Sequence, residues 1–315
     1  MMTKLGVPIL HSDQNGDNNV LIPGDRVDAC CRGMSADRQI RALALAETKT
    51  LVDWAADEGW NPGLCDADAF HAADPQGFLG VFVDGAMAAG ISAVAYGEHY
   101  GFVGLYICRP DMRGKGHGKA VWDAGMARLD GRTIGLDGVD AQLANYRSMG
   151  FAPAYRTVRY SGRLQAFQQR HGEADIRPVT AELMDAAEAF DRRFFPGSRQ
   201  AFLGHWLTSP HTALVVMRAG AIAALGVMRE CRQGLKLGPL FADDQADAES
   251  LLAAFAPVAG SGTIHLDVPE TSGAFAELLA SLGFSTGFET TRMYKGPLPA
   301  VSGHGVLAVT SLELG

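Results

Sequence analysis

The chain has 315 residues, of which 47% are hydrophobic and 20% are charged, and its formal net charge is −8 at pH 7. That length is sufficient for two ordinary domains with separate cores. The negative charge argues against nucleic acid or an anionic membrane as a partner, and no apolar run approaches the ~20 residues that cross a bilayer. The five scattered cysteines show neither disulfide nor metal-ligand spacing, so we expect a cytoplasmic protein that binds no metal.

Residues 1–35 are expected to form an N-terminal tail, because they include a polar stretch, HSDQNGDNN, without helical or strand periodicity. The next segment, 36–162, is expected to fold as a mixed α/β domain, here called the first unit. Apolar residues at helical spacing predict a helix at 45–58, and Asp84-Gly85 predicts a hairpin turn between two β-like runs. The pattern continues with a strand that Pro110 ends, a helix at 119–129, a buried strand at 133–138 and a helix at 141–149 that Gly150 ends.

Residues 163–174 are a charged segment that we expect to be a helical linker, and the second unit, 175–315, repeats the pattern of the first. Five short motifs recur in the same order at similar spacing, which indicates an internal duplication. The matched pairs are 40–41 and 176–177, 61–63 and 195–197, 85–89 and 220–224, 136–137 and 266–267, and 150–162 and 283–296. The first unit shows no obvious closing strand after Gly162, so we expect the second unit or the final run 305–315 to cover that sheet edge.

The most specific motif is the glycine-rich loop RPDMRGKGHGK, residues 109–119, which follows a strand and leads directly into a helix. Its glycines allow successive backbone N–H groups to point at one anionic group, and the helix N-terminus adds a partial positive charge. Arg113, Lys115 and Lys119 add full positive charges. The loop therefore predicts a pyrophosphate site rather than a turn that only caps a helix.

The spacing of this loop excludes two common nucleotide-binding loops. A Walker loop needs Gly where Arg113 stands and Ser or Thr where Ala120 stands. The dinucleotide fingerprint needs Gly where Lys119 stands and follows the first strand of its unit, whereas this loop follows a later one. What fits is Arg-x-x-Gly-x-Gly, from Arg113 to Gly118.

The strand, loop and helix together resemble the acetyl-CoA loop of the GNAT N-acetyltransferases. The run YRSMGF at 146–151 resembles that family's Tyr-x-x-x-Gly-Phe ending, and EGWNPG, YICRPDMRGKGHG and RMYKG resemble a bacterial subgroup with a second GNAT-like domain. The resemblance covers Gln39 to Gly315. It implies an α/β fold of two tandem GNAT-like domains, and an N-acetyltransferase that uses acetyl-CoA by direct attack of an amine on the thioester.

The resemblance also implies roles for individual residues. Tyr146 should act as the general acid that protonates the departing thiolate, and Val139 stands near the place of the family's pantetheine Asn, for which Asn145 is a weak substitute. The pyrophosphate and the pantetheine arm should be bound by the loop and by the strand before it. These cofactor-binding residues are Tyr106, Ile107, Cys108, Arg113, Gly114, Lys115, Gly116, His117, Gly118, Lys119 and Asn145.

The general base is left open among Glu98, His99 and Asp137. Some members of the resembling family carry a Glu on the strand before the loop, but Phe102 stands near that place here. Each candidate also has a structural explanation: Glu98 and His99 as solvated hairpin residues, and Asp137 as a strand-end cap.

Trp60 and Asn61 are the residues expected to line the acceptor pocket, although Trp60 is equally compatible with a core position. In the second unit, residues 239–247 replace the glycine-rich loop with three aspartates and no glycine, and Leu279 stands at the place of Tyr146. Negative charges repel a pyrophosphate. We therefore expect the second unit not to bind CoA, and to serve as a scaffold, an acceptor-site wall or a regulator.

Two functions stay open on the sequence alone. One is acetyl transfer to a small amine, an amino acid or a peptide N-terminus, and the other is an acetyl-CoA sensor without turnover. Tyr146 favours the enzyme, because a sensor has no use for a leaving-group acid. The expected partner is a small-molecule or peptide amine, with no nucleic acid and no membrane, and a homodimer is compatible with the sequence.

Overall fold

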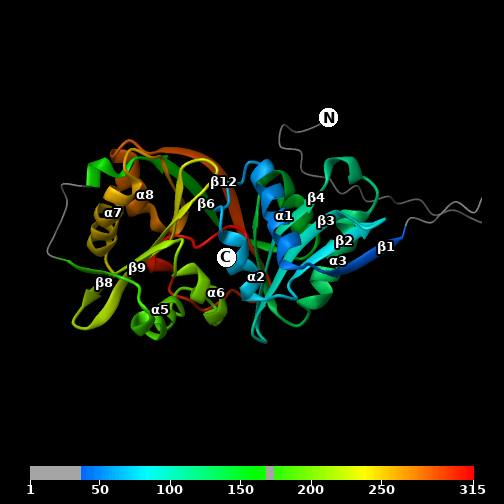
Figure 1. Cartoon of the computed structure of the whole chain (residues 1–315), viewed down its shortest axis with the longest axis horizontal. Helices are drawn as coiled ribbons and strands as arrows, with labels where there is room; N and C mark the ends of the chain where they lie inside the picture. Colours follow the sequence, from blue (N-terminus) through cyan, green and yellow to red (C-terminus); the bar gives the residue numbers. More distant parts are fainter. Residues whose placement is uncertain (1–36, 168–173) are drawn as a thin grey trace, which may run out of the picture.

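Within residues 37–167 and 174–315, which the computed structural model describes, thirteen strands form one continuous mixed sheet that runs through both units (Figure 1). The expected mixed α/β class is confirmed. The first unit contains β1 (Arg38–Ala42), α1 (Leu45–Asp57), α2 (Asp66–Ala73), β2 (Phe78–Val83), β3 (Ala86–Tyr96), β4 (Tyr100–Cys108), α3 (His117–Arg128), β5 (Thr133–Gly138), α4 (Leu143–Ser148) and β6 (Ala152–Gly162). The second contains β7 (Asp175–Pro178), α5 (Met184–Asp191), α6 (Gln200–Trp206), β8 (Thr212–Arg218), β9 (Ala221–Glu230), β10 (Leu235–Ala242), α7 (Gln245–Ala259), β11 (Ile264–Pro269), α8 (Gly273–Ser281), β12 (Ser285–Lys295) and β13 (Val306–Ala308).

The hairpin and helix predictions for the first unit are confirmed. Asp84 and Gly85 both have positive φ, 49° and 80°, as a two-residue turn between β2 and β3 requires. The helix expected at 45–58 is α1, with Leu51 and Ala55 fully buried on its inner face. Helix α2 had no specific prediction, because its eight residues are too short a run to show a clear period.

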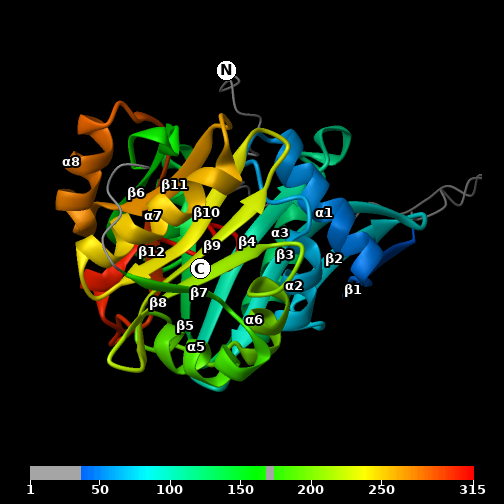
Figure 2. The same ribbon diagram turned by 60° about the vertical axis from the view of Figure 1, so that its left-hand side comes forward.

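The order of strands across the sheet is symmetric. It runs β1-β2-β3-β4-β5-β12-β6-β11-β10-β9-β8-β7, with β13 paired to β10. The counterparts are β1 and β7, β2 and β8, and so on to β6 and β12. If each strand is replaced by its counterpart, the same order results, read from the opposite edge of the sheet. The two units therefore exchange their last long strands: β12 of the second unit lies between β5 and β6, and β6 of the first lies beside β11 (Figure 2).

This exchange resolves the edge that the sequence left open. The strand that ends at Gly162 is β6, and it is covered on both sides by strands of the second unit, β11 and β12. The final run 305–315 contributes differently, because only Val306–Ala308 forms a strand there, on β10.

Two buried ion pairs fasten the exchanged strands, and they are related by the same symmetry. Arg292 of β12 donates to both carboxylate oxygens of Asp137 on β5, with Nε–Oδ1 and Nη2–Oδ2 distances of 2.8 and 2.7 Å. Arg159 of β6 donates to Asp267 of β11 in the same way, at 2.7 and 3.0 Å. Such two-point pairing fixes the register of each exchanged strand against its host.

The helices form three buried cores with the sheet. The helix α3 packs on the sheet of the first unit, and α7 and α8 pack on that of the second. The third core joins the units, because α1 and α2 meet α5 and α6 there, with Phe70 stacked on Trp206 at 5.9 Å. The two units therefore share a hydrophobic interior rather than touching through polar surfaces.

The expected tail, 1–35, and residues 168–173 of the expected linker lie outside the described residues. Of the linker, Leu164–Phe167 forms a 3-10 turn whose Leu164 and Phe167 are buried in the core of the second unit. Among the described helices, none combines the length and the apolar character that a membrane span requires.

Candidate active site

The site begins where β4 and β5 separate. The two strands pair in parallel from Tyr100 and Thr133 to Val103 and Leu136, and the pairing ends there. Leu105, just beyond, has a positive φ of 46° at a β-bulge. From Gly104 to Cys108, β4 keeps β3 on one edge and has no strand of the described chain on the other. The backbone of Tyr106, Ile107 and Cys108 thus borders a gap in the sheet.

The glycine-rich loop follows at the end of β4 and opens into α3. Gly114 and Gly116 have φ of 76° and 78°, and Gly116 is the N-cap of α3. The amides of Gly114, Lys115 and Gly116 donate to no group in residues 37–167 and 174–315. A Cβ at Gly114 or Gly116 would meet no atom within 4 Å, so the space above them is open. This is the geometry of an anion cradle at a helix N-terminus.

The cations of the loop do not all face that cradle. Arg113 donates from Nη2 to Glu58 at 2.5 Å and from Nε to the carbonyl of Cys108 at 3.0 Å, so its guanidinium braces the loop against the end of α1. Lys119 pairs with exposed Asp123 at 2.5 Å. Burial lowers the pKa of His117, whose Nδ1 is buried without a hydrogen bond to the described residues.

Tyr146 lies on α4 beside the gap, in a group of aromatic rings. Its ring stacks on Trp122 of α3 at 5.6 Å, and Trp122 in turn contacts Tyr106 and Phe151. Burial raises the pKa of Tyr146 to about 12, so the hydroxyl keeps its proton at neutral pH. A hydroxyl that stays protonated can donate a proton to an anion formed next to it.

Gln142 is a pocket residue that the sequence prediction missed. It is buried and lines the pocket, and its side-chain oxygen accepts a hydrogen bond from the side-chain Nδ2 of Asn145 at 2.6 Å. One donor of the Asn145 side chain is therefore engaged by Gln142. Gln142 precedes Tyr146 by about one helical turn. A search for an amide at that spacing, with Gln allowed as well as Asn, would have found it.

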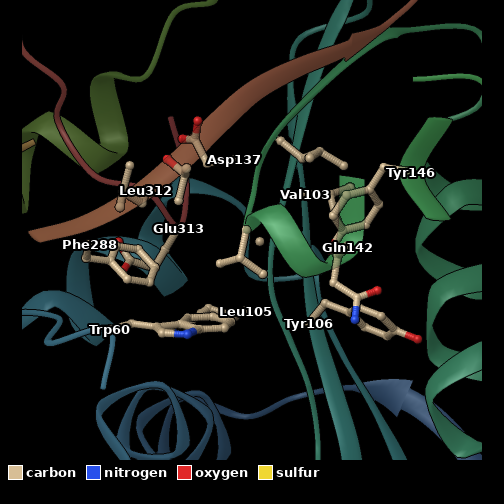
Figure 3. Close-up of a pocket in the computed structure, with 14 residues that line it drawn as sticks. Trp60, Val103, Leu105, Tyr106, Asp137, Gln142, Tyr146, Phe288, Leu312 and Glu313 are labelled. Carbon is tan, nitrogen blue, oxygen red and sulfur yellow. The ribbon is translucent and has the colours of Figure 1, made fainter. Parts of the chain in front are cut away.

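The pocket itself extends from the gap toward the second unit, and both units line it. Figure 3 shows Tyr106, Gln142 and Tyr146 on one side, and Trp60, Phe288, Leu312 and Glu313 on the other. Phe288 lies on β12, and Leu312 and Glu313 follow β13. The second unit therefore forms a wall of this pocket, one of the three roles that the sequence left open for it.

The structure brings some of the remaining predicted residues to the pocket and not others. Trp60 lines it, whereas Asn61 exchanges hydrogen bonds with the backbone of Gln233 at 2.9 and 3.1 Å. Glu98 and His99 are exposed at the β3–β4 turn, at the far end of β4 from the loop, roughly 25 Å away along the strand. Asp137 lines the pocket, but Arg292 donates a hydrogen bond to each of its carboxylate oxygens. Burial raises the pKa of Asp137, and the positive charge of Arg292 opposes that rise.

The corresponding gap in the second unit is filled by the chain itself. The strand β13 pairs with β10 at Leu240 and Phe241, and the amide of Val309 donates to the carbonyl of Asp267 on β11 at 2.9 Å. The three aspartates expected to repel a pyrophosphate have local partners: Asp243 pairs with Arg193, Asp247 pairs with Arg218, and Asp244 caps α7. Occupation of the gap is therefore a second and independent obstacle to a ligand there.

The described part of the chain contains no group of three or more His, Cys, Asp or Glu side chains arranged to hold a metal ion.

Comparison with known families gives two matches. Residues 42–153 match a family model described as "Acetyltransferase (GNAT) family", and residues 187–304 match one described as "Acetyltransferase (GNAT) domain". The sequence is also 33% identical over 278 residues to a protein named holothin acyltransferase from Pseudoalteromonas sp. (strain SANK 73390), covering 87% of this chain and 94% of that protein.

Solved structures share the fold over nearly the whole chain. A protein from Pyrococcus horikoshii, described provisionally as an acetyltransferase, superposes with a TM-score of 0.74 at 18% identity, covering 93% of this chain and 99% of that one. A tandem GNAT protein from the clavulanic acid biosynthesis pathway superposes with a TM-score of 0.57 at 14% identity, covering 83% and 100%. At these identities the likeness establishes the fold alone.

Proposed function

The chain belongs to the GNAT acetyltransferase family, and we propose that its first unit transfers the acetyl group of acetyl-CoA to the nitrogen of a small amine. One observation carries the proposal: loop amides and a strand edge that have no partner in residues 37–167 and 174–315 border the same gap between β4 and β5 as a protonated tyrosine. In the second unit β13 pairs with β10 at the corresponding edge, Leu279 stands at the place of Tyr146, and the loop carries three aspartates and no glycine. Binding and transfer are therefore assigned to the first unit.

The residues present fit acetyl-CoA part by part. The amides of Gly114 to Gly116 and the N-terminus of α3 would hold the pyrophosphate, with Lys115 and Lys119 close by in the loop. The edge of β4 at Tyr106 to Cys108, which no strand of the described chain covers, would pair with the amides of the pantetheine arm, and Gln142 would contact that arm from the pocket lining. Bound acetyl-CoA supplies a thioester carbonyl, and attack on it by an amine forms an amide and releases a thiol.

Tyr146 supplies the proton for that thiol. A thiol has an ordinary pKa of about 8.5, below the pKa of about 12 of Tyr146, so proton transfer from Tyr146 to the sulfur is uphill by itself. It goes to completion because Tyr146 regains a proton from the nitrogen as the amide forms. The stack on Trp122 fixes the ring of Tyr146 at the gap. The buried surroundings also exclude water, which competes with the amine for the acetyl group.

A small-molecule acceptor is favoured over a peptide by two observations. The pocket lies between the two units and must also receive the end of the pantetheine arm, so little room is left for a peptide chain. The relative that matches 87% of this chain is named holothin acyltransferase, a name that refers to no peptide or protein acceptor.

The alternative is a sensor that binds acetyl-CoA without turnover, and the two are separated by one assay. The full chain is mixed with acetyl-CoA and a panel of primary amines, and release of free thiol is followed against a control without amine. We expect amine-dependent release for at least one amine. Binding of acetyl-CoA without release across a broad panel would favour the sensor.

Tyr146→Phe is expected to lower kcat about tenfold or more, with a similar KM for acetyl-CoA, because the substitution removes only the acidic proton and keeps the ring on Trp122. Steady-state thiol release across the pH range measures the effect. Tyr160→Phe is the matched control, since Tyr160 packs against the core of the second unit away from the pocket. An unchanged kcat at every pH would reduce Tyr146 to a packing residue.

A further inference from the structure

We propose that Glu313, which the second unit places in the pocket of the first, accepts the proton of the incoming amine, and that the acceptor is a primary amine with an apolar or aromatic body and no carboxylate beside the nitrogen. The proposal rests on the acetyl transfer proposed above and names its base and its substrate class.

The chain is built to hold the segment around Glu313 against β3 and β4. The carbonyl of Glu313 accepts a hydrogen bond from Ser92 Oγ at 3.3 Å, and that of Leu314 accepts one from the Tyr96 hydroxyl at 3.1 Å. A Cβ on Gly104 would overlap the carbonyl of Glu313, so this close approach depends on glycine there. The segment is therefore a fixed part of the first unit's pocket, although it belongs to the second.

The carboxylate of Glu313 is buried but not consumed by an ion pair. Glu313 is 3% exposed and lines the pocket. Its carboxylate makes no hydrogen bond or ion pair with residues 37–167 or 174–315. The charged groups around it are engaged with one another: Arg229 with Asp66, and Lys236 with Asp267 at 3.7 Å. Burial raises the pKa of Glu313, and the nearby Lys236 and Arg229 oppose that rise. A carboxylate with a raised pKa and free lone pairs is suited to accept a proton.

The charge of the pocket lining favours an ammonium group. Among the residues that line it, the charged ones are Asp137 and Glu313, and no Lys, Arg or His is included. Asp137 is paired with Arg292, which leaves Glu313 as the charged lining residue without an ion pair to residues 37–167 or 174–315. A carboxylate on the acceptor would enter this pocket without a cationic partner, and burying an unpaired charge is costly. Trp60, Phe288 and Leu312 offer apolar contact to the rest of the molecule (Figure 3).

The protons balance as follows. The acceptor arrives as an ammonium ion, and Glu313 takes one proton, which frees the lone pair for attack on the thioester carbon. The C–N bond forms and the C–S bond breaks. Tyr146 gives its proton to the sulfur and regains one from the nitrogen as the amide forms, and Glu313 releases its proton to solvent. The products are the amide, the free thiol and one proton.

The substrate class is tested on the unaltered full chain with a matched pair, phenethylamine and phenylalanine, which differ by the α-carboxylate. We expect kcat/KM for phenethylamine to exceed that for phenylalanine by about a hundredfold or more. Equal or preferred use of phenylalanine would overturn the assigned class. Absence of thiol release with every amine tested would overturn the transfer function itself, and this inference with it.

The base is tested by Glu313→Gln, with Glu277→Gln on the exposed face of α8 as the matched control. We expect Glu313→Gln to lower kcat about 10²- to 10³-fold and to remove the fall in kcat/KM at low pH, with acetyl-CoA affinity unchanged by calorimetry. The titrating or charged neighbours that could move this profile are Asp66 of α2, Arg159 of β6, Arg229 of β9, Cys231 just after β9, Lys236 of β10 and Asp267 of β11.

Glu313→Asp keeps the charge and covers the case in which the amide variant does not fold. It is expected to retain the low-pH limb with a smaller loss of kcat, because the shorter side chain sets the carboxylate back from the amine. If a folded Glu313→Gln that binds acetyl-CoA keeps the wild-type kcat and pH profile while the wild type turns over, Glu313 is not the base and the transfer function stands. A Glu313→Asp that loses the low-pH limb also contradicts the proposal.

Discussion

Gly116→Asp is expected to abolish measurable acetyl-CoA binding, with a loss of affinity of at least about a hundredfold. Gly116 is the N-cap of α3 and its φ of 78° lies in the left-handed region. A side chain there projects into the open space above the loop amides and brings a carboxylate to the place of a phosphate. Like charges in contact at a partly buried site cost several kcal/mol, which alone accounts for a hundredfold loss.

Gly131→Asp is the control that separates this effect from backbone strain. Gly131 has the same φ of 78° and also has no atom within 4 Å of an added Cβ, but it follows the other end of α3. The helix between them has twelve residues, which places them about 18 Å apart. Isothermal calorimetry should give one binding site per chain for the wild type and for Gly131→Asp. Near-normal affinity in Gly116→Asp would contradict the assignment of the loop.

The local structure of the first unit and of its glycine-rich loop could be predicted because their signals are local. Asp84-Gly85 fixes a hairpin by backbone conformation alone, and Gly114 and Gly116 fix the open backbone of the loop in the same way. The duplication is visible because matched pairs such as Leu136-Asp137 and Leu266-Asp267 keep equivalent places in the two halves of the sheet.

The strand exchange could not be predicted from the same residues. Each unit has an Asp on its buried strand and an Arg on its last long strand. Pairing Asp137 with Arg159 inside one unit would satisfy the charges as well as the observed pair with Arg292. The apolar pattern of β12 is also the same whichever unit hosts it. The choice depends on contacts far apart in sequence, which single-sequence patterns do not contain.

Glu313 escaped the sequence analysis for a related reason. The family resemblance indicates a base near the loop, where Glu98, His99 and Asp137 stand in the sequence. Glu313 lies more than half the chain away from β4 and reaches it only because the segment after β13 crosses between the units.

The fragment 36–162 produced alone is expected not to form a stable, active monomer. Strand β12 lies between β5 and β6 and pairs with both of them. Its Met293 is fully buried in the core of the first unit. Losing that side chain costs about 2 kcal/mol, and losing the two hydrogen-bonded ladders costs more. A domain has about 5–15 kcal/mol of stability in total. The exposed strand edges that remain would promote association, so we expect insoluble or oligomeric material without acetyl-CoA binding.

Co-production of 36–162 with 163–315 is the matched experiment, because it restores every strand while leaving the chain cut. The two fragments should form a one-to-one complex that binds acetyl-CoA, since β12 can then enter between β5 and β6, and Arg292 and Arg159 can reach Asp137 and Asp267. Size-exclusion chromatography with light scattering and calorimetry would distinguish the outcomes. A soluble monomer of 36–162 with full affinity would mean that β6 has moved into the place of β12 beside β5, with Arg159 replacing Arg292 on Asp137. In that case the exchange would be one of two accessible pairings, and the sequence symmetry that makes them equivalent would be the physical cause.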